Sequence, residues 1–437
     1  MKPRSATRGR TRGFRGGATP RVAVGPEREL TIEAVGAQGD GLAEGLFIPL
    51  TLAGERVVAQ AEGERARLIE VLVPSPERVA PPCPHYGDCG GCALQHWALE
   101  PYLAWKVERI RLALARESLE TEILAPFAAA PGSRRRLALH ARKVGGRTVV
   151  GFKARRSWRV AAIDSCTVAE QALVGQFAAL GAIAEPFLEH SASAPTLHVT
   201  TTLTGLDIDV TGVERKSGGL SADARLRAAE AAARADVARV TLAGEVVYQS
   251  RAPQVRMGDA TVALPPGAFL QAVAAAEEAM ASFALEASLG ARKIADLHCG
   301  VGAFTFPLAK LAPVLAADIS PGAIQALRSA TATAPGLKSI TADARDLDRR
   351  PMLASELAGV DVVLFDPPRA GAEVQCREIA RSACPRVISV SCNPATFARD
   401  ARILADGGFT LAQVLPVDQF LWSPHIELVG VFSREGH

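Results

Sequence analysis

The chain has 437 residues, of which 48% are apolar, and a formal net charge of +3. This length is more than one hydrophobic core usually serves, so it predicts two or three domains. The sequence contains no apolar run of the roughly 18 residues that a membrane-spanning helix needs, and no apolar stretch follows its basic start. We therefore expect neither a transmembrane helix nor a secretory signal, and we expect a cytoplasmic protein.

The first 26 residues form a basic segment. They carry seven Lys or Arg and no acid, while the rest of the chain has 42 basic and 46 acidic residues. A segment rich in Arg and Gly cannot bury enough apolar surface to fold, so we expect disorder over 1–26. It either adds salt-sensitive affinity for nucleic acid or only keeps the protein soluble. A mitochondrial presequence is a further interpretation, but Gly16, Gly17 and Pro20 would interrupt its helix.

Residues 29–73, within a segment of 27–78, alternate between polar and apolar types, as strands do. Glycines recur at the expected turns, at Gly36, Gly39, Gly41, Gly45 and Gly54. Short strands at this spacing predict a small β-barrel. The proline-rich stretch 74–82 is typical of a linker.

The central segment, residues 79–255, opens with a cysteine cluster. Cys83, Cys89 and Cys92 lie within ten residues, and Cys166 is a candidate fourth ligand. In a chain without an export signal, metal binding is favoured over disulfides. The spacing fits a 4Fe-4S cluster on four thiolates better than zinc, which prefers paired, shorter spacings. Zinc and a metal-free structural cluster remain as alternatives.

A strongly basic stretch follows the cysteines. Residues 133–162 contain ten Lys or Arg and no acid, and they predict two strands, 137–142 and 148–153, joined at Gly145 and Gly146. This much positive charge on a hairpin indicates a polyanion partner such as a nucleic acid. A merely solvated surface is the alternative. Further strands are expected at 196–204 and 206–210.

From about residue 256, strands alternate with helices, which predicts a doubly wound parallel α/β sheet. The strands are expected at 294–297, 314–318, 360–365 and 386–390. The first leads into a glycine-rich turn, from Asp296 to Phe304, which resembles motif I of S-adenosylmethionine-dependent methyltransferases. Asp318, at the end of the next strand, is placed to bind ribose hydroxyls, and Asp343 is a candidate for the adenine edge.

Cys392 opens an Asn-Pro turn directly after the strand at 386–390. A thiol on such a rigid support is placed as a nucleophile, whereas the alternative is a small buried apolar side chain. The tetrapeptide from Asp366 to Arg369 precedes it, and Glu427 follows in an apolar segment that should raise its pKa. These residues together indicate covalent catalysis on a flat heterocycle.

These motifs resemble the RNA (uracil-5-)-methyltransferase family, and most closely its RumA-type members that modify 23S ribosomal RNA. The resemblance runs from about residue 29 to the C-terminus. It is carried by the cysteine cluster, Phe269-Leu270-Gln271, the turn at 296–304, and the segments 366–372, 391–400 and 425–427. The chain departs from the family pattern at Val273, His298 and Ala303, where many relatives have Asn, Phe and Asn.

The resemblance implies an α/β fold with a Rossmann-like class I methyltransferase domain over 256–437. A TRAM-like β-barrel at 27–78 and a central α+β iron–sulfur domain at 79–255 would precede it, with part of 97–125 packing against the catalytic domain. The cofactors would be S-adenosyl-L-methionine and a 4Fe-4S cluster on Cys83, Cys89, Cys92 and Cys166. The partner would be RNA, ribosomal rather than transfer RNA, and the protein a monomer.

The resemblance also assigns roles within the catalytic domain. Cys392 would be the nucleophile and Glu427 the base. Contacts to the cofactor or target base would come from Gln271, Asp296, His298, Gly300, Gly302, Ala303, Asp318, Asp343 and Asp366.

Three other functions compete with this prediction. A transfer RNA uridine methyltransferase would share the same motifs. A catalytically silent RNA-binding assembly factor would lack Cys392 or Glu427, and both are present. An N-methyltransferase of amino groups typically has Asn-Pro-Pro-aromatic, where this chain has Asp366 and Arg369 at the first and fourth positions.

Overall fold

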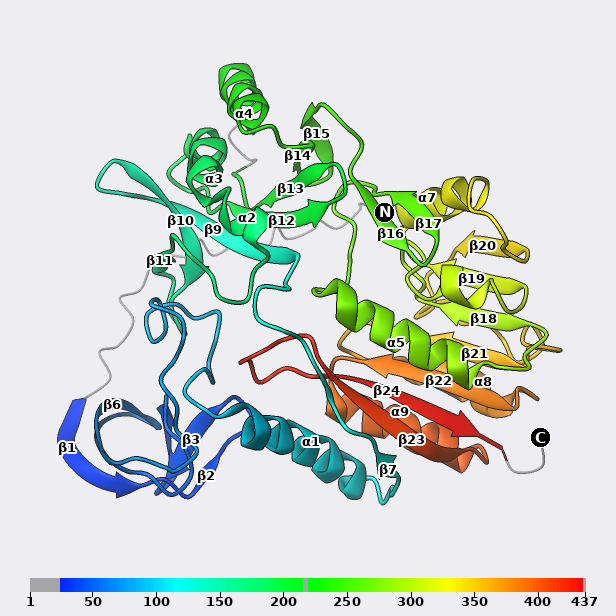
Figure 1. Ribbon diagram of the computed structural model, residues 1–437, viewed down its shortest axis with the longest axis horizontal. Coiled ribbons are helices and arrows are strands. Elements are labelled where there is room, and N and C mark those ends of the chain that lie inside the picture. Colours follow the sequence, from blue (N-terminus) through cyan, green and yellow to red (C-terminus); the bar gives the residue numbers. More distant parts are fainter. Residues whose placement is uncertain (1–23, 215–218, 435–437) are drawn as a thin grey trace, which may run out of the picture. The chain divides into compact units, whose positions relative to one another are not determined.

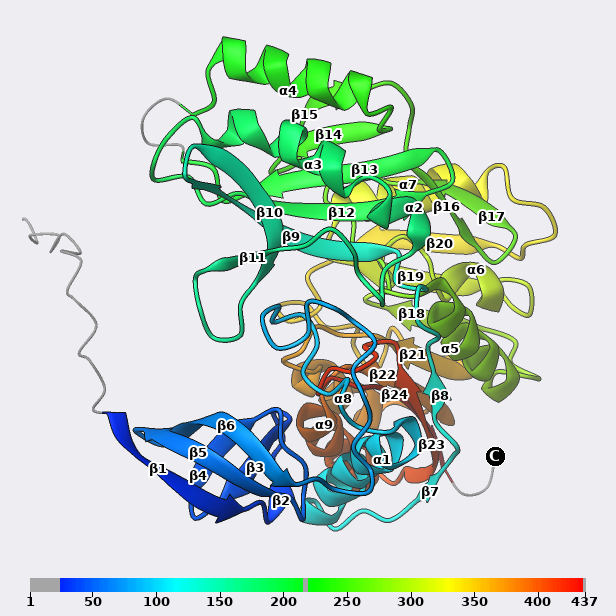
Figure 2. The ribbon, with the colours of Figure 1, turned by 60° about the vertical axis from the view of Figure 1, so that its left-hand side comes forward.

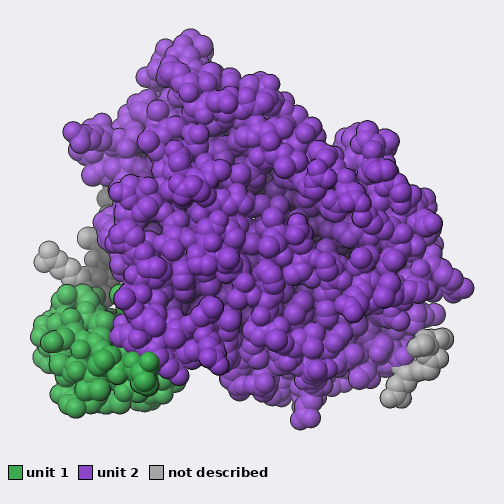
Figure 3. All heavy atoms as spheres, in the orientation of Figure 1, with its two compact units in different colours: residues 1–36, 40–76 green, residues 37–39, 77–437 purple. Residues whose placement is uncertain are grey.

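The computed structural model describes residues 24–214 and 219–434 of the chain. The chain folds into two compact units, residues 1–36 with 40–76 and residues 37–39 with 77–437, coloured separately in Figure 3. Most of the basic N-terminal segment lies outside the described residues, and so do the expectations about it. Within the described residues, no helix combines the length and the apolar character that crossing a membrane requires.

The first unit is a six-stranded sheet with the order β1-β5-β6-β4-β3-β2. Its strands are β1 (Val24–Thr31), β2 (Ala34–Val35), β3 (Asp40–Ala43), β4 (Leu46–Pro49), β5 (Arg56–Glu62) and β6 (Arg65–Val73). Alternate residues of the strands, such as Leu30, Val57 and Ala59, form its core. The predicted β pattern is therefore present. In the described part of the chain, no pairing between the edge strands β1 and β2 closes the sheet.

A seven-stranded sheet forms the middle of the second unit, in the order β11-β10-β9-β12-β13-β14-β15. Its strands are β9 (Arg136–Val144), β10 (Arg147–Lys153), β11 (Val160–Ala162), β12 (Thr196–Thr202), β13 (Gly205–Thr211), β14 (Arg239–Leu242) and β15 (Glu245–Gln249). Its helices are α2 (Gln171–Val174), α3 (Phe177–Ala184), the 3-10 helix η1 (Glu185–Leu188) and α4 (Ala222–Arg234). In Figures 1 and 2, α3 and α4 lie on the same side of this sheet.

The predicted basic hairpin is confirmed as β9 and β10. The two strands pair antiparallel with Val144 opposite Arg147. Gly145 and Gly146 between them have φ values of +57° and +79°, which glycine adopts without strain.

The C-terminal part of the second unit is built on a nine-stranded sheet. Its strands are β7 (Glu122–Ile123), β8 (Phe127–Ala128), β18 (Ile294–Leu297), β19 (Val314–Asp318), β20 (Ile340–Ala344), β21 (Val362–Phe365), β22 (Arg386–Ser391), β23 (Thr410–Asp418) and β24 (Glu427–Ser433). Its helices are α1 (Leu99–Arg116), α5 (Ala274–Ala287), α6 (Thr305–Leu308), α7 (Pro321–Thr331), α8 (Glu373–Arg381) and α9 (Pro394–Asp406), and a separate hairpin of β16 (Gln254–Met257) and β17 (Ala260–Ala263) contacts α7.

The sheet is mixed, which corrects the all-parallel sheet predicted from the sequence. The strands β20, β19, β18, β21 and β22 run parallel, but β24 pairs antiparallel with both β22 and β23. Alternate residues of each strand point to opposite faces, which gives two cores. Ile294 and Leu364 belong to one core and Ala295 and Val363 to the other. Figure 1 shows α5 on one face and α8 and α9 on the other.

The segment that precedes the seven-stranded sheet in the chain packs with the nine-stranded sheet. Helix α1 packs against α9, and β7 and β8 both pair with β23. The buried Lys106 of α1 donates a hydrogen bond to Asp418 at the end of β23, with an N–O distance of 2.6 Å, and the hydroxyl of Tyr102 donates to the same carboxylate at 2.7 Å. A buried charge pair with these added hydrogen bonds fixes the end of β23, next to the site described below.

Candidate active site

The loop after β18 is held in a conformation that glycine permits. Gly300 and Gly302 have φ values of +54° and +105°, and a Cβ on Gly302 would lie 2.6 Å from the ring of Phe306. Asp318, at the end of β19, accepts hydrogen bonds from the backbone N–H groups of Gly300 at 2.9 Å and Ser320 at 2.7 Å. The loop and the two strand ends therefore form one rigid edge, of the kind at which α/β sheets bind ligands.

A cavity of about 580 Å³ lies at this edge. Seven residues predicted from the sequence line it: Gln271, His298, Gly300, Asp318, Asp366, Cys392 and Glu427. The structure thus brings the predicted cofactor loop, nucleophile and base into one site.

Three further predicted residues support the loop without lining the cavity. Asp296 is fully buried and accepts a hydrogen bond from the hydroxyl of Thr305, and burial raises its pKa to about 7. Gly302 and Ala303 lie in the turn between these two residues. Their position fits a role in shaping the loop.

Asp343 is the one predicted cofactor-binding residue that the structure brings neither to the cavity nor to the loop at Gly300. Asp343 lies within β20 with its side chain exposed, and it does not line the cavity. Asp346 and Asp348, just after the strand, do line it. The strand ends one residue beyond Asp343, so the acids that reach the cavity come from the loop that follows.

His298 occupies an unusual place in the loop. Its φ is +60°, a left-handed conformation that residues with a Cβ rarely adopt. Burial lowers its pKa, so the ring is neutral near pH 7. Its buried Nε2 has no hydrogen-bond partner among the described residues. A polar atom in this state, on the wall of a cavity, is suited to bind a ligand.

Cys392 lies between β22 and α9. Asn393 caps α9, because its side-chain oxygen accepts a hydrogen bond from the N–H of Ala395 at 3.1 Å, and Pro394 begins the helix. The Nδ2 of Asn393 also donates to the carbonyl of Arg369 at 3.2 Å. The half-buried thiol is thus held beside the loop from Asp366 to Arg369.

Glu427 begins β24 and is almost fully buried. A chain of amide hydrogen bonds joins it to Asp366. Gln419 donates from its Nε2 to Glu427 at 3.2 Å and to the Oε1 of Gln271 at 2.6 Å, and Gln271 donates to Asp366 at 3.0 Å. The Oε1 of Gln419 accepts from the N–H of Ala272 at 2.7 Å. Gln419 is not among the site residues predicted from the sequence. Its only indication there is a polar pair, Asp418-Gln419, at the end of an apolar strand.

Two acids of the cavity, Glu427 and Asp366, have raised pKa values. Burial, with the charge of Asp366, raises the pKa of Glu427 to about 8, in the direction expected from its apolar segment. Burial likewise raises the pKa of Asp366 to about 7. The pKa of the Cys392 thiol is raised by burial and by Glu427, while the positive charge of Arg369 opposes this shift. Arg369 donates to the Nδ1 of His425 at 2.8 Å.

Part of the basic stretch is internal rather than exposed. Arg135 is buried and forms an ion pair with Glu277, with an N–O distance of 2.8 Å, and its Nε donates to the carbonyl of Gln271 at 3.1 Å. Arg136 lies over the ring of Phe269 at 5.1 Å from its centroid. Arg135, which belongs to the basic stretch but precedes the hairpin, therefore does not offer its charge to a polyanion partner and instead holds the segment that carries Gln271.

The four predicted metal ligands line one cavity of about 260 Å³, together with Arg134 and Phe152. They are Cys83, Cys89, Cys92 and Cys166. Burial raises the pKa of Cys89 to about 11 and that of Cys92 to about 12, and neighbouring thiols add to both shifts. As the described side chains stand, no three or more His, Cys, Asp or Glu are arranged to hold a metal ion. The 4Fe-4S cluster therefore stays a prediction, although four cysteine thiols are a donor set that fits such a cluster.

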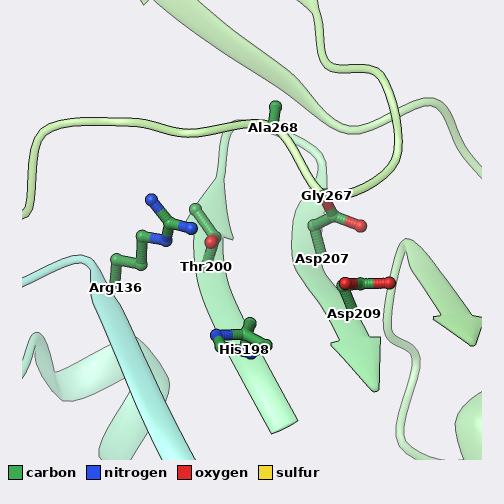
Figure 4. Close-up of a pocket in the computed structure, with 7 residues that line it drawn as sticks. All are labelled: Arg136, His198, Thr200, Asp207, Asp209, Gly267 and Ala268. Carbon is green, nitrogen blue, oxygen red and sulfur yellow. The ribbon is translucent and has the colours of Figure 1, made fainter. Parts of the chain in front are cut away.

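A second, smaller pocket of about 170 Å³ adjoins the candidate active site, because Gly267 and Ala268 line both. Figure 4 shows Arg136 on one side of it and Asp207 and Asp209 on the other. Both acids are engaged: Asp207 pairs with Arg239 at 2.8 Å, and Asp209 accepts from the hydroxyl of Thr241 at 2.6 Å. These contacts join β13 to β14, so Asp207 and Asp209 both have a structural role.

Comparison with known proteins places the chain among RNA methyltransferases. The sequence model of the tRNA (Uracil-5-)-methyltransferase family matches residues 221–435. An uncharacterized RNA methyltransferase of Caulobacter vibrioides is 63% identical over 93% of this chain and 100% of its own length. The 23S rRNA (uracil(1939)-C(5))-methyltransferase RlmD of Chromohalobacter salexigens is 34% identical over 99% of this chain and 94% of its own length.

A solved structure shares the fold. The tRNA (uracil-54, C5)-methyltransferase of Pyrococcus abyssi, in complex with S-adenosyl-L-homocysteine, matches with a TM-score of 0.71 and 22% identity, over 92% of this chain and 99% of that one. The likeness confirms the α/β class I methyltransferase fold predicted from the sequence.

The charges around Cys392 lead to a prediction about its titration. With a pKa of about 8, Glu427 is ionised in the alkaline range where Cys392 loses its proton, and its negative charge opposes the thiolate. Glu427→Gln should therefore shift the pH midpoint of Cys392 alkylation by iodoacetamide downward, and Arg369→Met should shift it upward. Peptide mass spectrometry would follow Cys392 separately from the other cysteines.

Arg377→Met, on the exposed face of α8, is the matched control and should leave the midpoint in place. An unchanged or higher midpoint in Glu427→Gln would contradict this account of the cavity.

Proposed function

This chain belongs to the RNA (uracil-5-)-methyltransferase family, and we propose that it methylates carbon 5 of a specific uridine in 23S ribosomal RNA, working in the cytoplasm with S-adenosyl-L-methionine as methyl donor. The observation that carries the proposal is the single cavity lined by Cys392, Glu427 and the loop at Gly300. A nucleophile, a base and a cofactor loop within one cavity are what such a reaction requires.

The first step in the proposed reaction belongs to Cys392. Carbon 5 of uracil is too weak a nucleophile to take a methyl group directly. The thiolate of Cys392 adds to carbon 6, a carbon–sulfur bond forms, and the electron pair of the ring double bond moves to the carbonyl at carbon 4 as an enolate. The base has to leave its stack to reach the thiol, by flipping or from a single-stranded loop.

Carbon 5 of this enolate then forms a bond to the methyl group, while the bond between that methyl group and the sulfonium sulfur breaks and its electron pair stays on the sulfur of the departing thioether. S-adenosylmethionine supplies that group as an electrophile on a sulfonium. Gln271, His298, Asp318 and Asp366 would bind the donor or orient the base, and the unpartnered Nε2 of His298 supports this assignment.

Glu427 completes the reaction in this proposal. It accepts the proton of carbon 5, and the electron pair left behind restores the ring double bond and expels the Cys392 thiolate. A pKa of about 8 suits a group that must take up a proton near neutral pH, and Gln419, which also donates to Gln271, holds the Glu427 carboxylate in place.

Transfer RNA is the second candidate substrate, since the matching family model and the Pyrococcus abyssi structure both carry transfer RNA names. Ribosomal RNA is favoured because the 34% identity to the 23S rRNA enzyme extends over nearly the whole chain.

A map of 5-methyluridine in RNA from a strain that lacks this protein decides between the two. We expect one uridine of 23S rRNA to lose its methyl group, and to regain it when the wild-type gene, but not a Cys392→Ala version, is returned. A loss confined to transfer RNA would support the second candidate, and unchanged RNA would contradict both.

We further propose that the first unit is a TRAM-like domain and that Cys83, Cys89, Cys92 and Cys166 hold a 4Fe-4S cluster in a central iron–sulfur domain. Four thiols on one cavity wall are the donor set of such a cluster, and Gly90 and Gly91 between them let the chain turn tightly.

Protein purified without oxygen should be brown and contain about four irons per chain. Cys166→Ser should lower the iron content, whereas Cys384→Ala, at a thiol outside the cavity, should not. Elemental analysis by mass spectrometry measures the iron and zinc content of the wild type and of both variants. One zinc per chain with no iron would overturn the assignment.

A further inference from the structure

The loop between β10 and β11 carries an exposed aromatic side chain. Trp158 is 74% exposed, the largest exposed fraction among the large apolar residues that the structure describes. A single exposed apolar residue is common on protein surfaces. The surroundings of Trp158 set it apart.

Cations surround the indole ring. The Nζ of Lys153 lies 4.1 Å from the centroid of the Trp158 ring. Arg155, Arg156 and Ser157 line, together with these two residues, a hollow of about 390 Å³. The stretch 133–162, which contains the loop, has no acid of its own. A flat apolar ring in a basic hollow fits a ligand that combines aromatic rings with negative charge.

The loop is held in place by the cysteine segment. Gly90, between two of the four cysteines, donates from its N–H to the carbonyl of Lys153 at 3.0 Å. A Cβ on Gly90 would lie 2.5 Å from that oxygen, so only glycine allows this contact. Asp88 forms an ion pair with Arg159 at the other end of the loop. These contacts hold the loop that carries the ring before any ligand arrives, which lowers the entropy cost of binding.

We propose that Trp158 stacks on an unpaired base of the RNA substrate while Lys153 and Arg156 contact the adjoining phosphates. Stacking on an aromatic ring does not depend on sequence, because every base has a π face, and a duplex hides those faces. The loop would therefore hold a single-stranded segment of the RNA, and it would be a binding site additional to the cavity of Cys392. This inference rests on the proposed function, since that function makes RNA the substrate.

Binding of fluorescein-labelled single-stranded oligouridine, followed by anisotropy, tests the stacking. Trp158→Ala should weaken binding by about 5- to 140-fold, the range that loss of one base–aromatic stack produces. Trp158→Phe should bind nearly as well as wild type, because a benzene ring still stacks. Leu226→Ala, at an exposed apolar residue of α4, is the matched control and should not change binding.

Salt dependence tests the phosphate contacts. Replacing Lys153 and Arg156 by Ala should each reduce the slope of log affinity against log salt by about 0.7. A duplex of oligouridine with oligoadenosine should bind Trp158→Ala and wild type equally, because its bases are already stacked.

Two results would overturn the inference. One is unchanged oligouridine binding by Trp158→Ala, which would show that Trp158 does not bind single-stranded RNA. The other is an equal loss in Trp158→Phe, which would show that the ring does not act by stacking. Failure of the proposed function looks different: wild-type protein would then methylate no uridine, whatever Trp158 does. For the active enzyme we expect Trp158→Ala to raise the KM for RNA and leave kcat unchanged.

Discussion

A single buried amide, that of Gln419, links Glu427 to Gln271, and Gln271 in turn donates a hydrogen bond to Asp366. Its Nε2 donates to Glu427 and to Gln271, and its Oε1 accepts from the backbone of Ala272. Because both ends of the amide are used, the side chain cannot turn without leaving a buried polar group unsatisfied, which is costly. The strand end that carries it is itself held by the ion pair between Asp418 and Lys106 of α1.

This arrangement also sets the charge state of the cavity. The burial that makes the hydrogen bonds strong is the burial that raises the pKa values of Glu427 and Asp366. In the proposed reaction, a carboxylic acid with a pKa of about 8 is a good proton acceptor once ionised, but its charge opposes the neighbouring thiolate. Arg369, beside Cys392, is the positive charge that offsets this repulsion.

Sequence patterns predicted the parts of the fold in which local pattern and tertiary structure agree. The strands at 294–297 and 314–318 were predicted to the residue, because buried parallel strands are near-continuous apolar runs. The antiparallel β24 was missed, since the direction of a strand depends on its neighbours. Arg135 was counted as surface charge because its partner, Glu277, lies 142 residues away. Gln419 was missed because a polar residue at the end of an apolar strand has no assignable role until Gln271 and Glu427 are beside it.

The central claim, a covalent reaction shared between Cys392 and Glu427, is tested most directly by Glu427→Gln with ordinary uridine RNA and S-adenosylmethionine. The account predicts that the methyl group is transferred and the reaction then stops, because the proton of carbon 5 has no acceptor. A methylated protein–RNA adduct should survive denaturing gel electrophoresis, and mass spectrometry should locate it on Cys392, with Cys392→Ala as the control. Full turnover by Glu427→Gln, or an adduct on another residue, would contradict the account.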